Sequence, residues 1–280
     1  MQGGPVSGGS VAVAVLSGGA GRRLGAPKAL YRLQGEILAA RALRVYSKAG
    51  DVYIVARPWI AGRLLRRGLP QSRILLDLPQ LPCTGPIAGI ATAAALLESY
   101  EVVVVIPVDS VWAGPELAED LARSAGRLGG IVSYRGARGS VYPLHVAGAP
   151  KELLKAALAA CGHPWSPPRA TGVLRAASPL YLLGDPPGGA RALATLNTPR
   201  DLESPGQLEP PAPRGPLVLE GHSSYYGLAA LGDATQAELS FKREAETYRE
   251  LDLTMLARHA ERDAASARLR GRRTLQAQQP

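Results

Sequence analysis

The sequence predicts an α/β fold, in which a mostly parallel sheet carries helices on both faces and a helical extension follows at the C-terminus. Short β-branched runs alternate with longer Ala- and Leu-rich segments through the first two hundred residues, as in βαβ units. The run EVVVVIPVD at 101–109 is apolar on both faces, which is typical of a central strand covered on each side. Five prolines between Pro205 and Pro216 then end this pattern.

The same alternation places the individual elements. We expect strands at 11–16, 52–56, 73–77, 102–107, 130–134, 141–146 and 179–183. We expect helices at 36–48, 60–67, 87–98, 115–124 and 151–160, and a short one at 199–203. Beyond the prolines, we expect a short helix at 221–231 and one long helix at 234–269, with an apolar edge of Leu239, Leu251, Met255 and Leu256. The predicted organisation is a domain at 1–204, a Pro-rich linker at 205–216 and a helical extension at 217–280.

Composition excludes several classes of protein. With 46% hydrophobic and 20% charged residues the chain can build a large core, whereas its longest apolar runs fall short of the roughly 18 residues that cross a bilayer. The start MQGGPVSGGS has no basic region followed by an apolar segment, so we expect a cytoplasmic protein. Cys83 and Cys161 lie far apart without metal-ligand spacing, which predicts buried small apolar residues and neither a disulfide framework nor a zinc site.

The positive charge is concentrated in the predicted α/β domain. The formal charge of +9 comes from 22 Lys and Arg against 12 Asp and Glu in residues 1–202, while residues 203–280 hold 10 against 11. Such an excess suits polyphosphate or nucleic-acid partners, or simply a solvated surface. No aromatic stripe suited to base stacking accompanies it, which argues against nucleic acid.

A glycine-rich loop follows the first expected strand. In LSGGAGRRLGAPK, residues 16–28, the glycines allow backbone N–H groups to face an anion, and Arg22, Arg23 and Lys28 add positive charge. The spacing of a Walker A loop is absent, and so is the acidic residue of a dinucleotide fingerprint. The loop indicates a polyphosphate site; the alternative is a glycine-rich turn with solvated basic side chains.

Polar residues follow three other expected elements. Asp109 ends the central strand, at the edge where open α/β sheets bind ligands, and a carboxylate there suits a hard cation such as Mg²⁺. Asp77 ends another strand, and residues 85–89 open a helix whose free N–H groups can face phosphate. The alternatives are turn residues for both aspartates, close packing for 85–89 and helix capping for Asn197 and Thr198.

Taken together, these motifs resemble those of the MobA-like molybdenum cofactor guanylyltransferases. LSGGAGRRLGAPKAL is similar to the family's L-A-G-G-x-x-x-R-M-G-x-x-K signature, and GPIAG at 85–89 to its G-P-L-A-G segment. PVDS at 107–110 resembles its strand-end P-x-D-[TM] motif, and NTPRDL at 197–202 its N-T-P-E-D-L motif. These motifs occur in the family's order within residues 11–202. The resemblance implies a Rossmann-like fold of the nucleotide-diphospho-sugar transferase type.

The resemblance also implies an activity and residue roles. The implied reaction transfers GMP from GTP to molybdopterin, a phosphorylated pterin, with Mg²⁺ as cofactor and pyrophosphate as the second product. Lys28, Asp109 and Arg22 would be catalytic, with Asp109 holding the metal. The implied nucleotide-binding set is Leu16, Ser17, Gly18, Gly19, Arg23, Lys28, Asp77, Gly85 and Asp109, and the implied acceptor-side residues are Tyr142 and Asn197.

Three departures from the family pattern affect the base and the acceptor. Tyr142-Pro143-Leu144 stands where the family often has His-Pro-Thr, Thr195 replaces the first Asn of N-x-N-T-P, and the strand ending at Arg57 lacks an Asn. The alternatives are CTP with molybdopterin, another nucleoside triphosphate with a sugar, polyol, cobinamide or phospholactate phosphate, or a nucleotide-binding regulator without turnover. The long helix needs a partner for its apolar edge, and we expect a homodimer through it or packing on the first domain.

Overall fold

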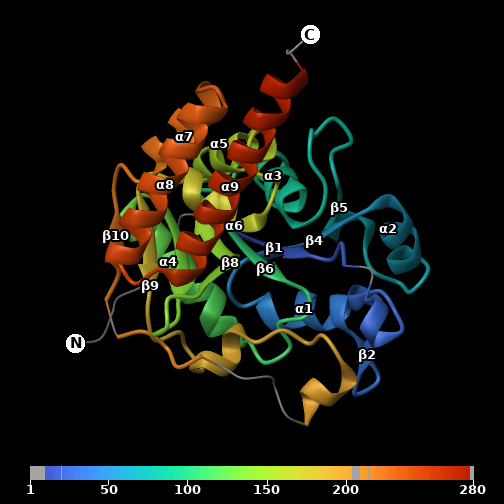
Figure 1. Cartoon of the computed structure of the whole chain (residues 1–280). Coiled ribbons are helices and arrows are strands. Elements are labelled where there is room, and N and C mark those ends of the chain that lie inside the picture. Colours follow the sequence, from blue (N-terminus) through green and yellow to red (C-terminus); the bar gives the residue numbers. More distant parts are fainter. Residues whose placement is uncertain (1–9, 20, 204–208, 214, 278–280) are drawn as a thin grey trace.

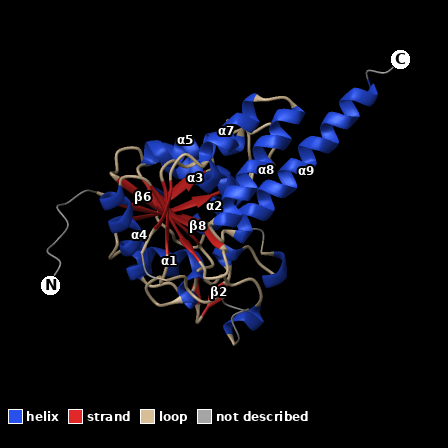
Figure 2. Ribbon diagram, turned by 60° about the vertical axis from the view of Figure 1, so that its left-hand side comes forward, coloured by secondary structure: helices blue, strands red, loops and turns tan. Residues whose placement is uncertain are grey.

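An eight-stranded mixed sheet organises the molecule (Figures 1 and 2). The computed structural model describes residues 10–19, 21–203, 209–213 and 215–277. The strand order is β10-β9-β7-β8-β6-β1-β4-β5, and among these described strands only β8 and β10 run against the others. The strands are β1 (Val11–Leu16), β4 (Asp51–Ala56), β5 (Ile74–Leu76), β6 (Val102–Pro107), β7 (Ile131–Arg135), β8 (Val141–Gly148), β9 (Leu180–Leu183) and β10 (Leu217–Leu219); β2 (Arg32–Leu33) and β3 (Glu36–Ile37) form a separate hairpin.

The strand expected at the centre of the sheet is there. Every residue of β6 is buried, between β1 on one side and β8 on the other. Valine and isoleucine suit this position because both faces of the strand are covered by helices. The fold class predicted from the sequence is therefore confirmed, although β10 was not expected.

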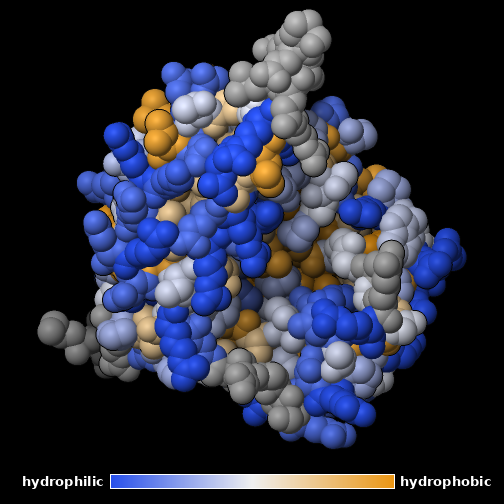
Figure 3. Space-filling model, in the orientation of Figure 1, coloured by the Kyte–Doolittle hydropathy of each residue, from blue (hydrophilic) through white to orange (hydrophobic). Residues whose placement is uncertain are grey.

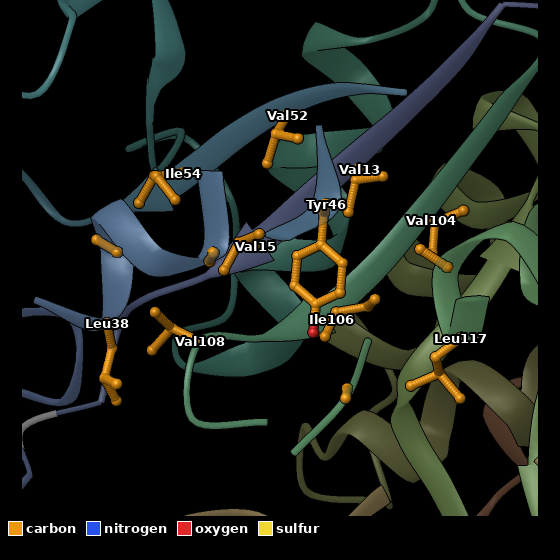
Figure 4. Close-up of a cluster of buried hydrophobic side chains, with 14 of the residues drawn as sticks. Val13, Val15, Leu38, Tyr46, Val52, Ile54, Val104, Ile106, Val108 and Leu117 are labelled. Carbon is orange, nitrogen blue, oxygen red and sulfur yellow. The ribbon is translucent and has the colours of Figure 1, made fainter. Parts of the chain in front are cut away.

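Helices cover both faces of the sheet. α1 (Leu38–Tyr46), α2 (Pro58–Leu65) and α4 (Pro115–Leu128) share one buried cluster with Val13, Val15 and Ile106, part of which is shown in Figure 4. α3 (Pro86–Leu96), α5 (Pro150–Cys161) and the unpredicted α6 (Ala170–Ala176) share the other cluster with Ala12 and Ala14. Alternate residues of β1 thus point to opposite helical layers, as the period of a strand requires.

The C-terminal extension consists of three helices. They are α7 (Ser223–Leu231), α8 (Ala234–Glu250) and α9 (Thr254–Ala277), and the single long helix expected at 234–269 is wrong. The chain reverses at Asp252, which has a φ of 55°, and α9 then runs back along α8 (Figure 2). None of the described helices is both long and apolar enough to cross a bilayer.

The reversal buries residues that a straight helix would leave in water. Tyr248 and Leu256 enter the same cluster as the α3–α5 face of the sheet, whereas Leu239, expected on the apolar edge, is 55% exposed. Leu219 of β10 belongs to that cluster too, and β10 pairs with β9. The extension therefore packs on the sheet's own core; its role as a separate unit and as a dimer contact stays a prediction.

A buried ion cluster joins the extension to α6. Arg175, 1% exposed, donates from Nε and Nη2 to the two carboxylate oxygens of Glu244 in α8, at 2.8 and 2.6 Å. Its Nη1 donates to Asp263 of α9 at 2.6 Å, and the guanidinium lies 4.5 Å from the centre of the Tyr226 ring. One cation thus neutralises two carboxylates that have been removed from water.

We predict that Arg175→Ala lowers the free energy of unfolding by about 3–5 kcal/mol, because it removes the guanidinium that pairs with buried Glu244 and leaves buried Asp263 with the weaker contact to Arg169, 3.5 Å away. Urea unfolding followed by circular dichroism measures the loss. Arg243→Ala, a change of an exposed arginine on α8, is the matched control and should cost less than about 1 kcal/mol. Equal stability of the two variants would contradict the prediction.

The two cysteines form a disulfide, which corrects the expectation of two unlinked apolar residues. Cys83 lies in the loop before α3 and Cys161 ends α5, with their Cα atoms 5.1 Å apart. Both side chains are buried, as expected, but packing of α3 against α5 brings together residues 78 positions apart. The spacing of the two cysteines in the sequence does not reveal this contact.

We predict that the double variant Cys83→Ser/Cys161→Ser is less stable by about 2–4 kcal/mol, because the bond restricts the unfolded chain across a long loop. Thermal unfolding with and without a reductant measures this. Reductant should lower the melting temperature of the wild type and leave that of the double variant unchanged; a wild-type melting temperature indifferent to reductant would contradict the prediction.

Candidate active site

A cavity of about 180 Å³ lies at the carboxyl edge of the parallel strands. The ends of β1, β4, β5 and β6 meet here with the start of α3, as parallel strands of one sheet must. Figure 3 shows the surface hollowed, with an apolar floor, over the part of the molecule where Figure 1 labels β1, β4 and β6. The cavity is lined by Leu16, Ser17, Gly18, Gly19, Lys28, Val55, Arg57, Asp77, Gly85, Pro86, Gly89, Pro107, Val108, Asp109 and Leu144.

The glycine-rich loop forms one wall of this cavity. Ser17 anchors its start, because both the backbone N–H and the hydroxyl of Ser17 donate to the carbonyl of Val55, at 2.9 and 2.7 Å. Gly21 has a φ of 59°, and a Cβ there would overlap the carbonyl of Ala26, so only glycine suits the turn. The N–H of Lys28 closes the loop on the carbonyl of Gly19 at 3.3 Å.

The ammonium group of Lys28 is the centre of the site. It forms an ion pair with the carboxylate of Asp109 and donates a hydrogen bond of 2.9 Å to the amide oxygen of Asn197. The Lys28 side chain is 21% exposed and that of Asp109 is 7% exposed, so little water screens the pair. Three motifs that are far apart in the sequence thus meet at one charge.

Local hydrogen bonds place Asn197 at this centre. The N–H of Leu196 donates to the carbonyl of Asp109 at 2.9 Å, which fastens the segment to the end of β6. Asp201 then accepts from the backbone N–H groups of Asn197 and Thr198, and these bonds lower the pKa of its carboxyl group. They complete the capping box of the short helix Pro199–Leu202, so the capping interpretation is confirmed.

Asp77 and Arg57 lie at the other end of the cavity. The N–H of Asp77 donates to the carbonyl of Ala56 at 3.0 Å, so the aspartate continues the sheet edge beside β4. Burial raises the pKa of Asp77, and the nearby Arg57 opposes that rise. Gly85, with a φ of 80°, begins α3 next to them. Arg57 was not assigned a role from the sequence; the one signal was that the strand ending at Arg57 lacks the Asn that the resemblance implies there.

A second groove, of about 520 Å³, opens on the other side of Asn197. Tyr142 and Asn197, the residues implied on the acceptor side, both line it, and burial raises the pKa of Tyr142. Because Lys28 lines the first cavity and bonds Asn197 in the groove, the two spaces meet at the Lys28–Asp109 pair. The other lining residues are Arg23, Ser140, Ala190, Leu193, Ala194, Thr195, Thr198, Asp201 and Glu209.

The structure therefore gathers most of the implied site residues around one point. Leu16, Ser17, Gly18, Gly19, Lys28, Asp77, Gly85 and Asp109 line the cavity. Arg23 lies instead among the residues of the second groove, and the side chain of Arg22 is outside the described part of the structure. The nucleotide, catalytic and acceptor roles of these residues remain proposals.

A buried histidine supports the residue after Asp109. His145 is 2% exposed, and its Nε2 lies 2.9 Å from the hydroxyl of Ser110. Burial lowers the pKa of His145 to about 3, so the imidazole stays neutral at physiological pH. The contact gives this histidine a structural role beside the end of β6.

The residues that form this cavity lie mostly within a segment that matches a known family. The MobA-like NTP transferase domain family matches residues 13–177. The chain belongs to this family. It is 32% identical over 114 residues to a probable molybdenum cofactor guanylyltransferase of Geobacillus sp. (strain WCH70), covering 40% of this chain and 56% of that protein. A protein of the same description from Methanothermobacter thermautotrophicus is 32% identical over 121 residues, covering 42% and 59%. The chain spans about half the length of the curated relatives it matches.

A solved structure shares the fold. Molybdopterin-guanine dinucleotide biosynthesis protein A from Archaeoglobus fulgidus superposes with a TM-score of 0.54 at 24% identity, covering 69% of this chain and 95% of that chain. The family match ends at residue 177, so the Asn197-Thr198-Pro199 segment and the C-terminal helices α7, α8 and α9 lie beyond it.

We predict that Lys28→Ala weakens nucleoside triphosphate binding at least tenfold, because a charge-assisted contact to phosphate is lost and a carboxylate is left unpaired. Titration calorimetry measures the affinity, and Lys151→Ala, a change of an exposed lysine on α5, is the matched control. An affinity in Lys28→Ala equal to that of the control would exclude the ammonium from triphosphate binding.

Proposed function

We propose that this protein transfers GMP from GTP to molybdopterin, producing a guanine dinucleotide cofactor and pyrophosphate in the cytoplasm. The observation that carries the proposal is the Lys28 ammonium, held by Asp109 and Asn197 where the cavity meets the second groove. A transferase that joins two phosphorylated substrates needs a charged centre between two binding spaces. The names of the curated relatives supply the substrates.

In the proposed reaction the nucleotide occupies the cavity and the acceptor phosphate occupies the groove. An oxygen of the acceptor phosphate attacks the α-phosphorus of GTP, forming a new P–O bond. The bond from the α-phosphorus to the bridging oxygen breaks, and the electron pair leaves with pyrophosphate. Backbone groups at Gly18 and Gly19 cradle the phosphates, while Lys28 stabilises the negative charge that develops on them.

The donor set at the centre suits Mg²⁺. The carboxylate of Asp109 and the amide oxygen of Asn197 converge on one ammonium group, and these are the hard oxygen ligands that Mg²⁺ prefers. No cluster of three metal-ligating side chains occurs among the described residues, so substrate phosphates and water would complete the coordination. When bound, the ion neutralises charge on the transferred phosphate.

The proposed base contact is Asp77. The half-buried carboxylate of Asp77 can accept N–H donors, and guanine carries such donors on its ring edge, whereas cytosine carries a single amino group. Arg57 lines the same cavity and can donate to the carbonyl oxygen of guanine. Because the strand that ends at Arg57 lacks the Asn that the resemblance implies against the nucleotide, CTP as the nucleotide is the second candidate.

Pyrophosphate release tests the proposal directly. The wild type is incubated with molybdopterin, Mg²⁺ and each of the four ribonucleoside triphosphates in turn, with glucose 1-phosphate as a second acceptor. We expect release with GTP and molybdopterin together. Release with CTP and with no other nucleotide would identify CTP as the substrate instead. Release with only the sugar phosphate would identify a sugar-phosphate nucleotidyltransferase. Tight GTP binding without release would indicate a nucleotide-binding regulator without turnover.

We predict that Asp109→Ala lowers the rate of pyrophosphate release about 10³-fold or more, because the carboxylate that holds the cation is removed while binding of the base is spared. Initial rates at saturating substrates measure this, with circular dichroism as the check on folding. Glu116→Ala is the control, because it removes an acidic side chain in the first turn of α4, outside the cavity. A folded Asp109→Ala protein with control-like turnover would remove Asp109 from the mechanism.

A further inference from the structure

The second groove is completed by a residue from beyond the segment that matches the family. Glu209 is half-buried and lines the groove together with Ser140 and Tyr142. Its carboxylate accepts hydrogen bonds from the backbone N–H of Arg138 and from the hydroxyl of Ser140, in the turn between β7 and β8. No motif in the sequence indicated a role for this glutamate.

The backbone around Glu209 is fastened to the same turn. The carbonyl of Pro210 accepts from the N–H of Ala137 at 2.9 Å, and Pro211 forms a β-bridge with Gly136. A Cβ on Gly136 would collide with the Glu209 carboxylate, so glycine leaves the space that this side chain fills. Glu209 is therefore held in one position at the wall of the groove.

The C-terminal helices hold the other side of this turn. The hydroxyl of Thr254, at the start of α9, donates to the carbonyl of Arg138 at 2.8 Å, and the N–H of Met255 donates to the carbonyl of Gly139 at 3.1 Å. Gly139 has a φ of 80° and no room for a Cβ beside the carbonyl of Asp252. The turn is thus clamped between the α8–α9 reversal and the groove.

The chemistry of the groove selects a ligand that donates hydrogen bonds. Two carboxylates line it, but Asp201 is already occupied by Asn197 and Thr198. A carboxylate offers about four acceptor positions, so Glu209 keeps some after binding the turn. Two adjacent N–H donors on one ring edge can each donate to one carboxylate oxygen, and the 2-amino-4-oxo edge of a pterin carries such a pair. Arg23, in the same groove, supplies a positive charge for a phosphate.

We infer that Glu209 binds the N–H edge of a pterin acceptor, and that the C-terminal extension positions the turn on which this contact depends. The inference rests on the proposed function, because it places the acceptor in the groove and the nucleotide in the cavity. It gives the residues after the family domain a part in acceptor selection.

Direct binding separates this inference from the proposed function. Molybdopterin binding to the full chain is followed by pterin fluorescence, and GTP binding by calorimetry, for the wild type, Glu209→Gln and the control Glu220→Gln. Glu220 is an exposed carboxylate on the same segment, outside the groove. We expect Glu209→Gln to weaken molybdopterin binding about tenfold or more, as for the loss of a hydrogen bond to a charged group, with GTP affinity unchanged.

A second variant keeps the negative charge of Glu209 but changes its position. Gly136→Ala displaces the carboxylate of Glu209 and should weaken molybdopterin binding in the same direction, again with GTP affinity unchanged. The inference would be overturned by equal molybdopterin affinity in the wild type and Glu209→Gln, or by a parallel loss of GTP affinity in that variant. It would also be overturned if the wild type bound no molybdopterin, or if it bound glucose 1-phosphate instead in a way that depends on Glu209. Failure of GTP binding in the wild type would count against the proposed function instead.

Discussion

The hydrogen-bonded ion pair of Lys28 holds the candidate site together. Its ammonium connects Asp109, 81 positions away, with Asn197, 169 positions away. Three parts of the site meet at this ammonium group. They are the glycine-rich loop, the end of β6 and the segment of Asn197 that borders the second groove. Because both oxygen atoms face the same ammonium group, one charge fixes the relative positions of the loop, the end of β6 and the segment of Asn197.

The C-terminal extension is tied to this assembly from two directions. The Arg175 cluster fastens α8 and α9 to α6, deep in the layer that covers one face of the sheet. After the C-terminal end of α8, the chain reversal at Asp252 meets the turn between β7 and β8, which borders the groove. The buried Arg175 cluster and the turn between β7 and β8 thus both connect the extension to the α/β domain, the second of them at the edge of the second groove.

Sequence motifs indicated which residues come together at the cavity. The loop at 16–28, Asp77, Gly85 and Asp109 each follow a strand or begin a helix, and parallel strands bring such positions to one edge without further information. Arg57 and Glu209 were not expected to line the cavity and the groove, because neither belongs to one of the motifs. Their places depend on which elements lie beside them in the fold, and residue type alone does not reveal those neighbours.

Sequence alone determined the alternation of strands and helices, the buried central strand β6, the glycine-rich turn and the four family motifs. These follow from preferences that act within a few residues: side-chain period, β-branching, glycine at positive φ and helix capping. Tertiary structure decided the Cys83–Cys161 bond, the folding back of α9 on α8, the partners of Lys28 and the place of Glu209 in the groove. Each of these contacts joins residues that are far apart in the sequence, and only the packing of the elements against one another sets which of them meet.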